Sequence, residues 1–233
     1  MTAATDIAGL VKDDRVHRRV YVDPDIFELE IERIFGRAWI FVTHESQIPA
    51  PGDFMRAQIG REPVLVVRDS GGEIRVLRNR CLHRGMLVCI AERGNAERFS
   101  CPYHGWVYGA DGQCIEMPNE PNQQFKHKIK ILAYPVEELG GLIFAYMGPR
   151  PAPLLPRWDL LVWDNIFRKV TFSEIPCNWL QCQENSIDPV HLEWLHGRWS
   201  HYLTNGARPE PKPHLKVGFG EFDWGLSYHR VSE

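Results

Sequence analysis

The sequence lacks features that would place it in several broad classes of protein. No apolar run approaches the ~20 residues that a membrane-spanning helix needs. Basic residues are not in excess, since 27 Lys and Arg accompany 30 Asp and Glu, and no Lys/Arg cluster is interleaved with aromatics. We therefore expect neither a nucleic acid nor a membrane as a partner.

The sequence also shows no pattern typical of a secretion signal or of a disulfide framework. The first twenty residues contain Asp6, Asp13 and Asp14 and no apolar signal core, so a cytoplasmic location is expected. Six cysteines in such a chain are more often ligands or buried thiols than disulfides. Four of them fit no ligand spacing and are predicted to pack as small apolar side chains: Cys89, Cys114, Cys177 and Cys182.

The 233 residues, 44% of them hydrophobic, suffice for one large or two ordinary domains. Residues 1–38 form a first segment, in which Asp23 and Pro24 are placed to begin an amphipathic helix. Residues 39–148 contain short β-type runs separated by turn signals and predict a mostly antiparallel β domain. The proline-rich stretch at 149–156 then begins a third part, 149–233.

That third part has two clear secondary-structure signals. The stretch "FRKVTFSEI", residues 167–175, predicts a strand. The stretch from Trp179 to Leu195 predicts one helix. Together with the preceding β domain, these signals predict an α+β protein.

The most specific pattern is a pair of short ligand motifs. Cys81 and His83 form C-x-H in "NRCLHRG", and Cys101 and His104 form C-x-x-H in "SCPYHGW". Two loops that each supply one thiolate and one imidazole suit a Rieske [2Fe–2S] cluster, with both cysteines on one iron and both histidines on the other. The nearby glycines allow backbone N–H groups to approach the bridging sulfides.

A structural Cys₂His₂ zinc site is the main alternative. Such sites usually place the two cysteines close together and the two histidines close together, at spacings unlike these. Four unrelated core or surface residues are the other alternative. The four-ligand pattern with its glycines favours the iron–sulfur cluster over both.

"CLHRG" and "CPYHGW" resemble the Rieske fingerprint in the form found in aromatic-ring-hydroxylating oxygenases and their ferredoxins. Respiratory Rieske proteins add a disulfide, at positions that Met86 and Tyr103 occupy here. The resemblance matches Tyr108 to a tyrosine that can donate to a cysteine sulfur, and places Trp106 where respiratory proteins have a donating serine. Fewer hydrogen bonds to sulfur imply a potential toward the low end of the Rieske range.

A second ligand set follows in "ENSIDPVHLEWLHG". Asp188 and His191 share one helix face, and a distortion or helix end after His191 would bring His196 back to the same point. Two converging histidines are two-thirds of the 2-His-1-carboxylate triad of non-haem Fe(II) oxygenases. Taken alone, the pattern also fits a plain polar helix face. An upstream electron-delivering cluster favours the metal site.

The segment also resembles the mononuclear-iron motif of the same oxygenase family. By that resemblance His191 and His196 ligate Fe(II), and Asp188 links a Rieske histidine to an iron histidine across neighbouring subunits of a trimer. The family's third iron ligand is an aspartate far downstream. The acidic residues after His196 have no matching context: Glu210, Glu221, Asp223 and Glu233. We therefore expect a fragment, or a chain completed by another.

The resemblance implies the N-terminal part of an oxygenase alpha subunit, with a Rieske domain followed by the start of an α+β mononuclear-iron domain. Electrons from NAD(P)H would arrive through a separate reductase, with or without a ferredoxin. The iron would activate O₂ for attack on an aromatic substrate, by dihydroxylation, monohydroxylation or O-demethylation. A homotrimer or an alpha/beta hetero-oligomer is implied. A non-catalytic electron carrier or an incomplete chain is the alternative.

Overall fold

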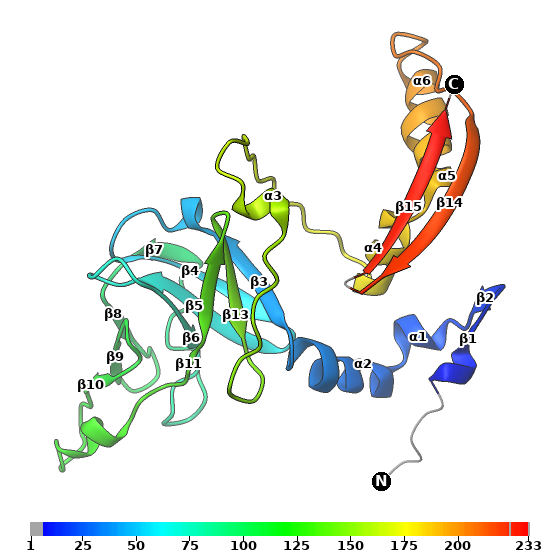
Figure 1. The fold of residues 1–233 in the computed structure, drawn as a ribbon. Coiled ribbons are helices and arrows are strands. Elements are labelled where there is room, and N and C mark those ends of the chain that lie inside the picture. The colour runs from blue at the N-terminus through cyan, green and yellow to red at the C-terminus, as the bar shows by residue number, and fades with distance from the viewer. Residues whose placement is uncertain (1–6, 224, 233) are drawn as a thin grey trace. The chain divides into compact units, whose positions relative to one another are not determined.

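The computed structural model describes residues 7–223 and 225–232, which form two compact units (Figure 1). One unit comprises residues Pro24–Thr171, and the other combines the N-terminal residues to Asp23 with the segment that begins at Phe172. In the described part of the chain, no helix has the length and apolar character that a bilayer crossing requires. The domain boundaries that the sequence predicts, between residues 38 and 39 and between residues 148 and 149, stay predictions.

Three antiparallel sheets build the unit of residues 24–171. A five-stranded sheet has the order β11-β6-β5-β4-β7, with bounds Ala133–Tyr134, Ile74–Arg78, Glu62–Arg68, Asp53–Ile59 and Arg93–Asn95. A three-stranded sheet joins β12 (Val136–Leu139), β13 (Leu142–Tyr146) and β3 (Trp39–His44). The last sheet joins β10 (Cys114–Glu116), β9 (Val107–Gly109) and β8 (Arg98–Ser100). The predicted antiparallel β domain is confirmed.

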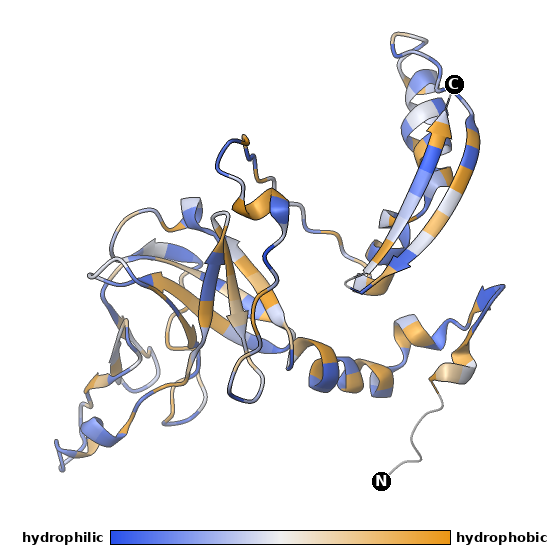
Figure 2. Ribbon diagram, in the orientation of Figure 1, coloured by the Kyte–Doolittle hydropathy of each residue, from blue (hydrophilic) through white to orange (hydrophobic). Residues whose placement is uncertain are grey.

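The position of strand β5 between two cores explains why residues 64–67 are an unbroken apolar run. Leu65 and Val67 point into a core shared with β8–β10, whereas Val64 and Val66 point into a core shared with β13. All four side chains are fully buried because the strand is covered on both faces. Figure 2 shows the same apolar character along the central strands.

The helix predicted after Asp23 forms as α2 (Pro24–Glu30) and continues as a π-helical turn, η2 (Ile31–Phe35). Pro24 at the first position removes an N–H that would have had no helical partner. Short helices complete this unit: η3 (Glu45–Gln47), η4 (Phe125–Lys128) and α3 (Asp159–Val162).

The other unit contains helices and two hairpins. Its N-terminal elements are η1 (Ala8–Leu10), β1 (Val11–Lys12), β2 (Arg15–Val16) and α1 (Arg19–Val22). Its helical run comprises α4 (Trp179–Ser186), α5 (Pro189–His191), η5 (Leu192–Trp199) and α6 (Ser200–Leu203). The hairpin of β14 (His214–Phe222) and β15 (Gly225–Ser232) follows. The amide of Asn178 donates to the carbonyl of Tyr21 at 3.1 Å and ties α4 to the N-terminal elements.

Two predictions about this region were wrong. Residues 167–175 form no strand, and Phe167 and Ile175 are exposed there, because backbone groups need a neighbouring strand that this stretch does not have among the described residues. The single helix expected from Trp179 to Leu195 is interrupted at Ile187 and Asp188. Pro189 causes the break, since proline lacks an N–H and disfavours helical geometry in the residue before it.

Candidate metal centres

The first candidate centre is built by two loops with the same internal geometry. Cys81 lies near the start of the loop between β6 and β7, and Cys101 begins the loop between β8 and β9. In each loop the cysteine N–H donates to the carbonyl five residues later at 2.8 Å, and the N–H four residues later donates back at 2.8 to 2.9 Å. Gly85 and Gly105 close these turns at φ +74° and +70°, a conformation that favours glycine.

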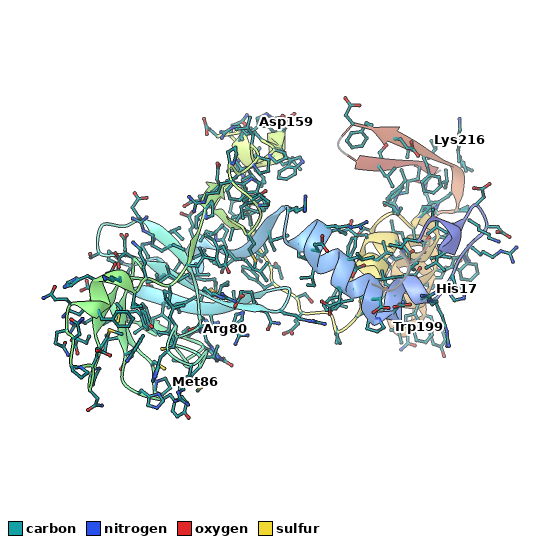
Figure 3. All side chains as sticks on the ribbon, turned by 90° about the horizontal axis from the view of Figure 1, so that it is seen from below. His17, Arg80, Met86, Asp159, Trp199 and Lys216 are labelled. Atoms are coloured by element: carbon teal, nitrogen blue, oxygen red, sulfur yellow. The ribbon has the colours of Figure 1, made fainter. Side chains whose placement is uncertain are left out.

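The two loops place thiols inside and imidazoles outside. Cys81 and Cys101 are only 3% and 2% exposed, whereas His83 and His104 are exposed, with ring centroids 4.5 Å apart. The ring of His83 also stacks on Trp106 at 4.9 Å. Figure 3 labels Arg80 and Met86, which lie on either side of the first motif. The two predicted histidine ligands, one from each loop, therefore lie together, and so do the two predicted cysteine ligands.

The protonation states suit metal ligation. Desolvation, and then the neighbouring His83 and Arg84, lower the pKa of His104, which favours the neutral imidazole that a metal binds. Burial, and then the adjacent Cys81, raise the pKa of the Cys101 thiol. Two buried thiols side by side favour the thiolate form only when a cation is bound between them.

Tyr108 lies behind the first loop and is completely buried. Its hydroxyl accepts a hydrogen bond from the Leu82 N–H at 3.2 Å and lies 3.4 Å from the Cys81 Sγ. Burial, and then the Cys81 sulfur, raise the pKa of Tyr108, so its hydroxyl keeps its proton. Since the oxygen already accepts from the backbone, its proton is available to the sulfur.

Among residues 7–223 and 225–232, no group of three or more His, Cys, Asp and Glu side chains is arranged around one metal-ion position. A binuclear cluster does not require one, because each iron takes two protein ligands.

The second candidate centre depends on a local change of helix geometry. The segment η5 (Leu192–Trp199), which follows His191, is a π-helix, whose wider turn brings residues five apart in sequence close in space. His191 and His196 are five apart, and their ring centroids lie 5.3 Å from one another. The distortion predicted after His191 is thus confirmed.

Asp188 is placed between the two helices that flank the break. Its Oδ1 accepts from the N–H of Val190 at 2.8 Å and of His191 at 3.4 Å, so it caps α5. Its Oδ2 lies 3.7 Å from His191 Nδ1, beyond hydrogen-bond distance. That nitrogen is buried and has no hydrogen-bond partner among the described residues, so it is available to a metal or a proton acceptor.

The burial of the cysteines outside the candidate centres matches the sequence predictions only in part. Cys177 is exposed, which contradicts its prediction as a packed side chain, whereas Cys89 and Cys114 are buried as predicted.

Gly197 contacts Pro211 so closely that a Cβ at position 197 would be 2.6 Å from the proline ring. That contact was missed because the two residues are fourteen positions apart and neither belongs to a motif.

Comparison with known proteins agrees with the first centre. Residues 38–135 match the family model of the Rieske [2Fe-2S] domain. The fold and the donor set thus define a Rieske iron–sulfur protein.

Other matches cover more of the chain. The 5,5'-dehydrodivanillate O-demethylase oxygenase subunit of Sphingobium sp. (strain NBRC 103272 / SYK-6) is 44% identical over 206 residues, covering 86% of this chain and 48% of the relative. Biphenyl 2,3-dioxygenase subunit alpha of Rhodococcus jostii (strain RHA1) is 49% identical over 150 residues, covering 61% of this chain and 32% of the relative. The structure of naphthalene 1,2-dioxygenase from Rhodococcus sp. bound to indole matches with a TM-score of 0.72 and 32% identity, over 91% of this chain and 51% of that one.

The chain therefore contains a Rieske domain and is similar to oxygenase subunits of Rieske-type ring-hydroxylating enzymes. It spans about half the length of the demethylase subunit and of the naphthalene dioxygenase chain. The architecture is α+β, with an antiparallel Rieske domain followed by part of the catalytic domain.

Proposed function

We propose that this chain supplies the electron-accepting centre and two iron ligands of an oxygenase that attacks an aromatic substrate with O₂. The observation that carries the proposal is the presence of two ligand sets in one chain: four cluster donors in the β unit, and a histidine pair at the start of a π-helix and within it. A ferredoxin would need only the first set. The second set supports an enzyme component.

The cluster ligands in this proposal are Cys81, His83, Cys101 and His104. When bound, the cluster supplies a one-electron carrier. Cys81 and Cys101 would hold one iron away from water, since both are at most 3% exposed. The two histidines face solvent, so they present the centre to an electron donor. We propose a separate reductase that draws on NAD(P)H as the source, with or without a ferredoxin.

His191 and His196 are the proposed ligands of a mononuclear Fe(II). When bound, that iron supplies positions open to O₂. Asp188 orders this site by capping the helix that carries His191 and by placing a carboxylate 3.7 Å from its Nδ1. We propose that Asp188 also accepts a hydrogen bond from a cluster histidine of a neighbouring subunit in the assembled oligomer.

The substrate is proposed to be aromatic, and O-demethylation is the favoured reaction. The relative that matches 86% of this chain is named as an O-demethylase oxygenase subunit. The relatives named as biphenyl and benzene dioxygenases match 61% and 56% of the chain, and support dihydroxylation as the second candidate. The proposed domain limits are 39–148 for the Rieske domain and 149–233 for the start of the catalytic domain.

The test combines analysis of the metals with an assay. The purified protein should contain iron and acid-labile sulfide and, once reduced, give an EPR signal of mixed Cys/His ligation. Assembled with a reductase, it should release formaldehyde from a methoxylated biaryl in an NAD(P)H- and O₂-dependent manner. A colourless zinc protein would contradict the cluster. A red-brown protein that is reduced but never forms an oxygenated or demethylated product would be an electron carrier.

A further inference from the structure

Two cysteines outside both candidate centres lie in direct contact at the start of α4. The Sγ atoms of Cys177 and Cys182 are 3.3 Å apart. Asn178 caps this helix by accepting from the Leu180 N–H at 2.8 Å. The thiols therefore occupy the position before the cap and the fourth position of the helix, which face each other across the first turn.

In many helices this pair of positions holds two apolar side chains that pack together. Here both are thiols, Cys177 is exposed, and Cys182 is partly exposed, so the contact buries little apolar surface. Cys89 and Cys114, in contrast, are buried. Among the cysteines outside the proposed cluster, only this pair combines mutual contact with access to solvent in the described structure.

We propose that Cys177 and Cys182 form a reversible oxidation site, in which a peroxide converts the two thiols to an intrachain disulfide. Disulfide formation requires the sulfurs to approach by only a little more than 1 Å from their present contact, to a bond of about 2.05 Å. The site needs neither proposed metal, so it is independent of the proposed oxygenase function.

The chemistry balances with one peroxide for each disulfide. The thiolate of the exposed Cys177 attacks a peroxide oxygen, the O–O bond breaks, and a sulfenic acid forms as the leaving oxygen takes up a proton. The sulfur of Cys182 then attacks the Cys177 sulfur. The S–O bond breaks, and hydroxide leaves with the Cys182 proton as water. Two electrons pass from the sulfurs to the peroxide, and a dithiol reductant returns them.

The disulfide would close a short ring around the helix cap. Asn178 lies inside that ring, and its side-chain amide donates to the carbonyl of Tyr21 at 3.1 Å. The Tyr21 hydroxyl in turn donates to Glu184, two residues beyond Cys182. Oxidation therefore modifies the point at which the N-terminal elements are held against the helix.

Tryptic mapping tests the proposal directly, because residues 170–198 contain both cysteines and no internal Lys or Arg. The holoprotein is treated with graded hydrogen peroxide, then denatured, alkylated and digested. We expect this peptide to lose about 2 Da and both alkylation sites, and to regain both after treatment with dithiothreitol. Over half should be converted at a dose that leaves Cys89, in the separate peptide 85–93, fully alkylated.

Two single variants are the matched controls. Cys89→Ser should leave the conversion unchanged, whereas Cys182→Ser should abolish the 2-Da loss and leave Cys177 to oxidise to sulfinic or sulfonic acid. The proposal is overturned if both thiols stay alkylated when Cys89 is already oxidised. It is also overturned if each gains oxygen separately in the wild-type protein, or if the 2-Da loss persists in Cys182→Ser.

Discussion

The hydroxyl of Tyr108 receives one hydrogen bond from the backbone and is 3.4 Å from a cysteine sulfur of the proposed cluster. A donor to sulfur withdraws negative charge and makes reduction easier. Tyr108→Phe should therefore keep the cluster but lower its reduction potential by tens of millivolts. A redox titration followed by EPR measures the shift. Tyr103→Phe removes a hydroxyl from an exposed ring and serves as the control; equal potentials in both variants would exclude the sulfur bond.

Asp188 allows its structural and its functional role to be separated by two substitutions. Asn retains the oxygen that caps α5, so Asp188→Asn should change the free energy of unfolding by less than about 0.5 kcal/mol, whereas Asp188→Ala should lose about 1 kcal/mol. In the assembled oxygenase, Asp188→Asn should lower product formation at least tenfold while reduction by the partner stays near normal.

That outcome depends on the charge that Asp188 places beside His191 Nδ1. Urea unfolding measures the change in the free energy of unfolding. Stopped-flow reduction with single-turnover product yield measures the change in electron transfer and product formation. Near-wild-type turnover of Asp188→Asn with both metals in place would limit Asp188 to its capping role.

At the scale of elements, the π-helix η5 decides whether two histidines can meet. Gly197 lies within it, one position after His196, and packs against Pro211 from the loop before β14. The network around Glu193 supports the same contact, since Arg198 bonds to Glu193 at 3.4 Å and to Glu210 at 3.3 Å. The loop thus holds the π-turn from outside.

Gly197→Ala tests this support. Alanine gains about 1 kcal/mol in helix propensity, but the clash with Pro211 costs about 1–3 kcal/mol, so we expect a net loss of about 1 kcal/mol. Fe(II) binding by the histidine pair should weaken about tenfold as the turn shifts. Gly218→Ala in β14 is the control, because a Cβ there meets nothing within 4 Å. Unchanged iron affinity in Gly197→Ala would show that Pro211 does not position His196.

At the scale of the whole molecule, the two proposed metal sites should differ in how tightly they hold iron. Dialysis against a chelator should remove the iron of a site with two protein ligands and leave the cluster, so that iron and sulfide approach equal amounts. Iron and sulfide analysis before and after dialysis measures this. His191→Ala should match the dialysed wild-type protein from the start. Excess iron that survives dialysis in the wild-type protein and is lost in His191→Ala would show that a carboxylate of this chain completes the site.

Much of the candidate site was predictable because ligand spacing is a local property. The C-x-H and C-x-x-H motifs, the antiparallel β texture and the need for a distortion between His191 and His196 all follow from residues close in sequence. The helix break at Asp188 was also encoded locally, in Pro189, although the uninterrupted helical pattern concealed it. The exposure of Trp194 and Trp199 was not encoded in that way, because burial depends on which other elements cover a face.

By itself, the sequence determined the donor types, their grouping into two sets and the α+β class, since each depends on chemistry and periodicity within a few residues. Only the tertiary structure decided that the loops at Cys81 and Cys101 meet, that Tyr108 reaches a sulfur, that Pro211 lies on Gly197 and that Cys177 is exposed beside Cys182. Except for the cysteine pair, which meets across one helix turn, these contacts join strands, turns and loops that are separated along the chain. Their distances are set by packing and sheet register, which no local pattern specifies.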